Sequence, residues 1–140
     1  MLRTCIPALA LASLALPAFS QETPSPEGAQ VYVISPADGA TLTNPVTIVF
    51  GLAGMGVAPA GADFENTGHH HLLINITPEE IALDEPLPAT EQIVHFGGGQ
   101  TQVTTELPPG EHTLRLLLGD MNHIPHDPPV VSEPITVTVE

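Results

Sequence analysis

Histidines are the residues of this chain whose spacing most clearly suggests chemistry. His69, His70 and His71 are consecutive and run into an apolar segment, residues 72–76, that has the composition of a β-strand. Side chains alternate across a strand, so His69 and His71 should share one face while His70 lies on the other. Two imidazoles placed in this way can reach a single metal ion. The alternative is a strand end whose histidines only form hydrogen bonds.

Further histidines occur at three positions that the fold could bring close to this strand. His123-Ile124-Pro125-His126 holds two imidazoles in a loop stiffened by proline, and His95 precedes a run of three glycines. Imidazole ligation without thiolate suits copper(II), zinc or nickel, and we favour copper or zinc, bound for carriage or buffering. The predicted metal ligands are His69, His71, His123 and His126, with His95 in reserve and Asp120 or Asp127 as hydrogen-bond partners of the ligands.

Two other functions remain open from the sequence. The first is a metal-free interaction module whose histidines form a hydrogen-bonded or pH-responsive network. The second and weaker one is a metal-assisted hydrolase, with Asp120, Asp127 or Glu65 as the base, because no spacing singles out one carboxylate. His112 is expected to be structural, with its ring bonded to a backbone carbonyl at the corner of a strand.

Short segments of alternating or β-branched residues, separated by Gly and Pro turns, must position these side chains. They predict an all-β fold, an immunoglobulin-like β-sandwich of about seven antiparallel strands. Thr77-Pro78-Glu79-Glu80 has the pattern of a capping box and predicts one helical turn. Residues 53–68 and 119–133 are expected to be long loops. The predicted strands cover residues 31–34, 46–52, 69–76, 92–96, 101–107, 112–118 and 135–139.

The direction of these strands predicts where the histidines meet. Sequential antiparallel strands alternate in direction, so the start of the third strand and the ends of the fourth and sixth lie at the same end of a sandwich. Six of the seven histidines then belong to one end, and His112 belongs to the other.

The first 20 residues have the pattern of a secretory signal peptide: Arg3, an apolar stretch and a small-x-small site at Ala18-Phe19-Ser20. The expected organisation is a signal peptide at 1–20, a flexible leader at 21–29 and a single domain at 30–140. Cys5, the only cysteine, would leave with the signal peptide. We therefore expect a periplasmic or secreted domain without a disulfide.

The charge balance narrows the possible partners. Removal of residues 1–20 leaves Arg115 as the only basic side chain against 16 acidic ones, a net charge of 1 − 16 = −15. Such a surface repels nucleic acid and anionic lipid, which excludes both as partners. The partners that remain are a metal ion and a periplasmic protein, with no membrane insertion of the mature chain.

Five parts of the sequence carry a resemblance to a known family. They are Ile34-Ser35-Pro36-Ala37-Asp38-Gly39, the segment from Phe50 to Gly61, the segment from Asn66 to Ile74, the segment from His95 to Thr101 and the segment from Leu117 to Val130. These motifs resemble those of small exported bacterial proteins with a domain of unknown function, family 4399. The resemblance covers nearly all of the chain beyond the predicted signal peptide. It implies an exported single domain and supplies no activity.

Overall fold

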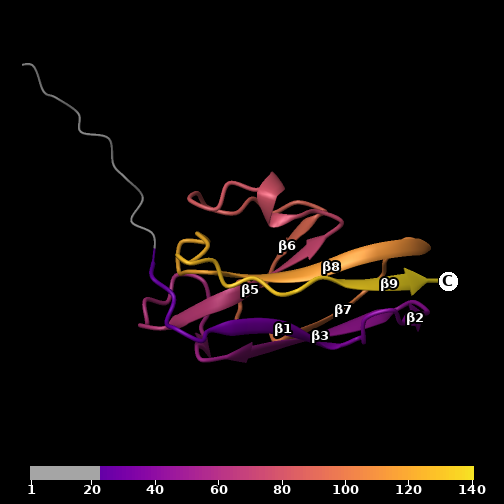
Figure 1. The fold of residues 1–140 in the computed structure, drawn as a ribbon, viewed down its shortest axis with the longest axis horizontal. Coiled ribbons are helices and arrows are strands. Elements are labelled where there is room, and N and C mark those ends of the chain that lie inside the picture. Colours follow the sequence, from indigo (N-terminus) through magenta and orange to yellow (C-terminus); the bar gives the residue numbers. More distant parts are fainter. Residues whose placement is uncertain (1–22) are drawn as a thin grey trace, which may run out of the picture.

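The computed structural model describes residues 23–140, and the predicted signal peptide lies outside this range. The described part contains nine β-strands and one short 3-10 turn, which confirms the predicted all-β class. In the described residues, no helix has the length and apolar character needed to cross a membrane. The strands are β1 (Gln30–Ser35), β2 (Thr41–Leu42), β3 (Val46–Ala53), β4 (Gly56–Val57), β5 (Thr67–Ile74), β6 (Ile93–His95), β7 (Gln102–Thr105), β8 (Gly110–Gly119) and β9 (Ile135–Val139). Figure 1 shows them arranged in two layers, with β1 and β3 in one and β5, β8 and β9 in the other.

The two sheets differ in size. The smaller has the strand order β1-β3-β7 and is antiparallel throughout. The larger has the order β2-β9-β8-β5-β4, with β6 also paired to β5; its β2–β9 and β4–β5 pairs are parallel and its other pairs antiparallel.

Apolar side chains fill both faces of the larger sheet. The main core lies between the sheets and includes Ile48, Phe50, Leu72 and Leu116. A second, smaller cluster is formed by Leu73, Leu87, Ile93 and Leu117. Leu72 and Leu73 are neighbours in β5 and therefore lie on opposite faces of the strand, so the second cluster packs on the outer face of the larger sheet. Segment 76–92, which includes the 3-10 turn Pro78–Glu80, contributes to that cluster and covers this face.

The strand count corrects the prediction of about seven. Seven longer strands match the predicted segments, and the additional strands, β2 and β4, have two residues each. Residues 53–68 are therefore not one structureless loop, because β4 pairs with the start of β5. The predicted helical turn is present, and the Glu80 carboxylate accepts a hydrogen bond of 2.8 Å from the Thr77 backbone N–H. The two-layer, all-β arrangement is thus the part of the predicted fold that is confirmed.

Candidate metal centre

Strand β5 places two imidazoles under the loops on the outer face of the larger sheet. In the β5–β8 pair, His69 lies opposite Gly119 and His71 lies opposite Leu117. Leu117 belongs to the smaller apolar cluster on the outer face of the larger sheet, which we call the outer cluster. Both histidines are completely buried. His70 points to the main core, where its ring centroid is 5.2 Å from that of Phe50. The predicted alternation of the three histidines is confirmed.

Strand β6 brings a third imidazole to the same place. His95 is the last residue of β6 and pairs with His71 across the β5–β6 ladder. Its Nε2 atom lies 3.1 Å from Nε2 of His69, a hydrogen bond in which one ring donates and the other accepts. His95 is only half-buried, so it lies between the buried rings and solvent.

Two glycines make room for these rings. A Cβ atom at Gly97 would overlap the imidazole of His95, and one at Gly119 would lie 2.7 Å from Cε1 of His71. Any side chain at either position would force the ring to move. Neither glycine has a positive φ, so space rather than backbone conformation explains the absence of a side chain.

The loop after β8 supplies the fourth imidazole. His123 adopts a left-handed backbone conformation with φ of 69°, which is uncommon for a residue other than glycine. Hydrogen bonds hold it there: its N–H donates to the Asp120 carbonyl and its carbonyl accepts from the Leu87 N–H, each at 2.9 Å. Its ring centroid lies 4.6 Å from that of His95 and 5.1 Å from that of His69.

We call His69, His71, His95 and His123 the four-histidine cluster. Their ring centroids are between 4.6 and 6.4 Å apart. Ring nitrogens of His69, His95 and His123 all lie within 4.8 Å of one another. Two nitrogens bound to one ion at about 2.0–2.1 Å would be about 2.9–3.4 Å apart. The 3.1 Å separation of the Nε2 atoms of His69 and His95 falls in this range.

The environment keeps the buried rings neutral. Burial, reinforced by the imidazoles of His95 and His123, lowers the pKa of His69 to about 4. Burial, reinforced by His69 and His95, lowers the pKa of His71 to about 3. The pKa of His95 is lowered by burial and by His123. At neutral pH these rings therefore carry free lone pairs, the form in which histidine binds metal.

Several buried ring nitrogens of the cluster have no partner. Nδ1 of His69 and both nitrogens of His71 are buried without a hydrogen bond. A buried polar atom left unpaired costs about 1–3 kcal/mol, so such atoms call for an explanation. A bound ion would use one nitrogen of each ring that it touches, which makes the donor set a fit for a metal.

The structure does not bring His126 into the cluster, although the sequence placed it among the ligands. Its Nε2 donates a hydrogen bond to the Thr67 carbonyl at 3.2 Å. A Cβ atom at Gly68 would lie 2.9 Å from Cε1 of His126 and the same distance from Leu118, a main-core residue. His126 therefore lies on the face of β5 opposite to His69 and His71.

The two carboxylates predicted to bond to the ligands, Asp120 and Asp127, make other contacts in the structure. Asp120 is buried, and its Oδ1 accepts hydrogen bonds from the backbone N–H groups of Asn122 and Ile124 while its Oδ2 accepts one from the Thr23 hydroxyl. It shapes the turn that carries His123. Asp127 is exposed, and its backbone, rather than its carboxylate, bonds to the 23–25 segment.

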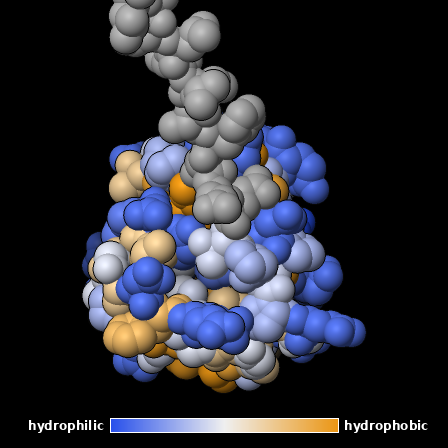
Figure 2. All heavy atoms as spheres, turned by 90° about the vertical axis from the view of Figure 1, so that its left-hand side faces the viewer, coloured by the Kyte–Doolittle hydropathy of each residue, from blue (hydrophilic) through white to orange (hydrophobic). Residues whose placement is uncertain are grey.

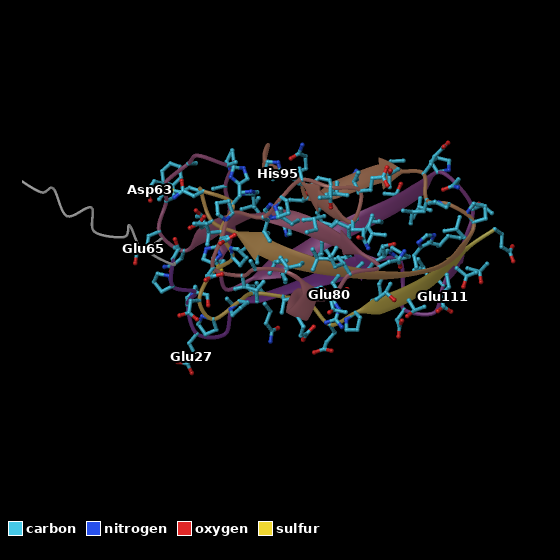
Figure 3. The ribbon with its side chains drawn as sticks, turned by 90° about the horizontal axis from the view of Figure 1, so that it is seen from above. Glu27, Asp63, Glu65, Glu80, His95 and Glu111 are labelled. Atoms are coloured by element: carbon cyan, nitrogen blue, oxygen red, sulfur yellow. The ribbon has the colours of Figure 1, made fainter. Side chains whose placement is uncertain are left out.

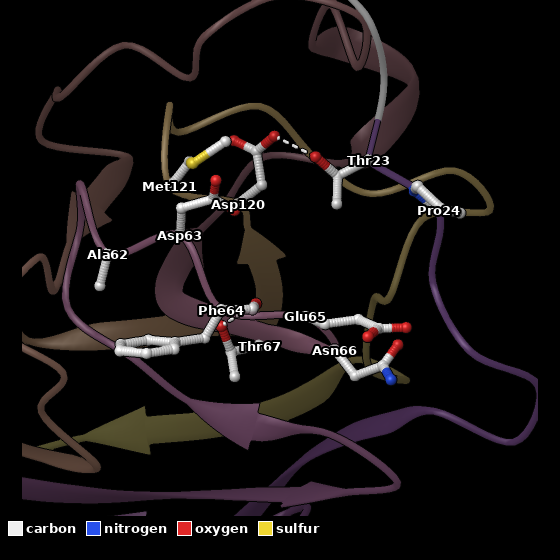
Figure 4. A pocket seen from close by; sticks show the side chains of 10 residues that line it. All are labelled: Thr23, Pro24, Ala62, Asp63, Phe64, Glu65, Asn66, Thr67, Asp120 and Met121. Carbon is white, nitrogen blue, oxygen red and sulfur yellow. Dashed lines mark hydrogen bonds between the residues drawn. The ribbon is translucent and has the colours of Figure 1, made fainter.

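A cavity of 280 Å³ opens beside the turn that carries His123. Figure 4 shows its walls, with Met121 and Asp120 on one side and Asp63 and Glu65 on the loop between β4 and β5. Figure 3 shows Asp63 and Glu65 at the end of the molecule opposite to Glu111. Figure 2 looks at this end, where hydrophilic residues predominate and hydrophobic ones gather along the lower edge. Asp63, Glu65 and Asp120 thus line a cavity beside the turn that carries His123, and acidic side chains favour the approach of a cation.

Sequence reasoning missed the contributions of Gly97, Gly119 and Thr23. The glycines carried a signal, because each directly follows a predicted strand (92–96 or 112–118) that ends at the predicted site, but only the ring positions show what they accommodate. Thr23 lies in the predicted flexible leader, and nothing in its neighbourhood in the sequence pointed to Asp120.

Comparison with known proteins identifies the family. The model of the family described as a domain of unknown function (DUF4399) matches residues 48–140. The chain belongs to this family. The matched range contains every histidine of the four-histidine cluster. No curated protein and no solved structure gives a significant match.

Proposed function

We propose that this DUF4399 domain is an exported protein that binds a copper or zinc ion at the four-histidine cluster, for carriage or buffering. The observation that carries the proposal is the 3.1 Å separation of the Nε2 atoms of His69 and His95, in a group of three rings whose nitrogens lie within 4.8 Å. An ion bound to both Nε2 atoms would replace the proton of this hydrogen bond. His69, His95 and His123 are the proposed ligands, with His71 as the fourth.

The ligand chemistry supports copper or zinc. All the proposed donors are imidazoles, and the only cysteine of the chain, Cys5, lies in the proposed signal peptide. Met55, the thioether in the loop after β3, packs against the main core. Imidazole donors suit both ions, and among divalent metals copper binds such sites most tightly.

The burial of the four imidazoles and the hydrogen bonds of Asp120 support carriage of an ion rather than catalysis. His69 and His71 are completely buried, whereas His95 and His123 are half-buried and can exchange the ion with solvent or with a partner protein. Both oxygens of Asp120, the carboxylate closest in sequence to His123, accept hydrogen bonds from protein groups. Asp120 is thus not free to act as the base that a metal hydrolase needs.

The proposal is tested by metal analysis of untagged protein and by competition titration with copper(II) and zinc(II). His95→Gln and His123→Asn remove one half-buried ring each, and asparagine tolerates the left-handed backbone at 123. Both variants should lose at least about 10-fold in affinity. His112→Gln is the matched control, since it removes an imidazole that bonds to Asn75 and the Pro108 carbonyl instead.

The alternative function is a metal-free periplasmic interaction module with a hydrogen-bonded histidine network. The 3.1 Å bond between His69 and His95 is the observation that favours it. A wild-type protein that binds neither ion, and whose melting temperature does not change when they are added, would contradict metal binding and support this module.

We also propose that the two layers form an immunoglobulin-like sandwich and that residues 1–20 direct export to the periplasm. His112, bonded to the Pro108 carbonyl at 2.7 Å at the start of β8, supports the first proposal because its ring takes the place of a tyrosine at a strand corner. Amino-terminal sequencing of protein from the periplasmic fraction tests the second, with Gln21 as the expected first residue.

A further inference from the structure

Residues 23–25 lie against the loop that carries His123. Pro24 forms a parallel bridge with Asp127. The Asp127 N–H donates to the Thr23 carbonyl and the Ser25 N–H to the Asp127 carbonyl, each at 3.0 Å. The Ser25 hydroxyl donates to the Pro128 carbonyl at 2.7 Å. These contacts fix the segment along the outgoing side of the loop.

One further contact joins this segment to the turn at residues 120–124, which carries His123. The Thr23 hydroxyl donates to Oδ2 of Asp120 at 2.7 Å, across 97 residues of sequence. Asp120 is only 2% exposed, so this bond replaces the water that the oxygen would otherwise need. A hydrogen bond to a buried carboxylate is stronger than one between neutral groups.

The other oxygen of Asp120 sets the backbone on both sides of His123. Oδ1 accepts from the N–H groups of Asn122 at 2.8 Å and Ile124 at 2.9 Å. The Asp120 backbone adds two more bonds, since its carbonyl accepts from the His123 N–H and its N–H donates to the Ile124 carbonyl. Asp120 is therefore the centre of the turn, and the left-handed conformation of His123 depends on it.

We propose that Thr23 is a positioning residue for the four-histidine cluster, acting through Asp120 on His123. The inference rests on the proposed function, because the property that it controls is metal affinity. Without the Thr23 hydroxyl, Oδ2 of Asp120 must turn toward water and Oδ1 turns with it. The two backbone bonds then weaken, and His123 leaves the geometry in which it can join His69 and His95.

The test compares two substitutions at Thr23 with one at Ser25. Thr23→Val keeps the shape and removes the hydroxyl, whereas Thr23→Ser keeps the hydroxyl. Ser25→Ala is the matched control, because it removes a bond of the same length from the same segment without touching Asp120. Zinc(II) and copper(II) affinities are measured by competition, and amide hydrogen exchange of residues 120–125 is measured in the metal-free protein.

Thr23→Val should weaken the binding of both ions by about 10-fold and speed amide exchange in the turn, while Thr23→Ser and Ser25→Ala should bind as the wild type does. Equal affinity in Thr23→Val and wild type would overturn the inference and leave metal binding intact. Equal loss in Ser25→Ala would also overturn it, because the segment would then act as a whole. A wild type that binds no ion would instead overturn the proposed function, and the exchange data would still report on the turn.

Discussion

At the scale of single residues, the positions of the imidazoles depend on the absence of side chains beside them. Gly97→Ala should displace the ring of His95, because the new Cβ would overlap it. We expect metal affinity to fall by about 10-fold. The free energy of unfolding should change by less than about 1 kcal/mol, since Gly97 is half-exposed and has an ordinary φ.

Gly98→Ala is the control for that experiment. A Cβ at Gly98 would meet only the end of the Gln100 side chain, at 3.1 Å, and that side chain can move away. Both variants are compared by titration with zinc(II) and by urea unfolding. If Gly97→Ala and Gly98→Ala bind zinc equally well, the ring of His95 does not need the space that Gly97 leaves.

The sequence was informative about residues on strands and uninformative about residues in the turn. The period of a strand is two, so the faces of His69, His70 and His71 followed from their order alone. The turn at 119–127 has no such period. Its left-handed His123 and the bridge between Gly119 and Pro125 send His126 to the opposite face of β5 from His69, and no local pattern encodes that reversal.

At the scale of elements, segment 76–92 links the apolar cluster on the outer face of the larger sheet to the four-histidine cluster. Leu87 packs its side chain with Leu73 and Leu117 and donates its backbone N–H to the His123 carbonyl. Leu87→Ala should lower the free energy of unfolding by about 2–5 kcal/mol. It should also weaken metal binding, because the segment whose backbone bonds to His123 would lose the packing of the Leu87 side chain.

Leu114→Ala is the matched deletion in the main core, where Leu114 is completely buried. It should cost at least as much stability and leave metal affinity unchanged under conditions where the protein stays folded. Urea unfolding and metal titration of both variants separate the two effects. Equal affinity in both would show that segment 76–92 does not position His123.

Some of the strands could be predicted from the sequence and others could not. Strands such as β3 and β8 have enough alternating or apolar residues to be recognised. β2 and β4 have two residues each, and they pair because neighbouring strands are in reach rather than because of their own composition. The parallel pairs that they form depend on the tertiary arrangement, which sequence periodicity does not describe.

At the scale of the whole molecule, buried neutral imidazoles make the metal-free protein sensitive to acid. The pKa of His69 is lowered from 6.5 to about 4 and that of His71 to about 3, mainly by burial. Between pH 6 and 5 the unfolded chain therefore binds protons that the folded chain does not. Stability is full well above pH 6.5 and falls as the pH drops through it, and the slope from these two groups approaches about 2.7 kcal/mol per pH unit near pH 5.

Urea unfolding of chelator-treated protein at pH 7, 6 and 5 measures this slope. His69→Gln/His71→Gln removes both titrating groups, so the same series on that variant should be flatter. A wild-type stability that does not change between pH 7 and 5 would mean that these imidazoles are solvated. Carboxylates contribute little in this window, because their ordinary pKa values lie near 4.

The alternation of β5 has a consequence for the order of events in a cell. In the unfolded chain nothing separates His69, His70 and His71, so all three can chelate an ion together, whereas the folded strand turns His70 inward to lie opposite Leu118. The ion that we propose would therefore bind both states, and it would stabilise the native state by less than the native affinity alone would give. A chain that captures its ion too early must release His70 before β5 and β8 can pair. Under the proposed function, loading after folding would be the faster route.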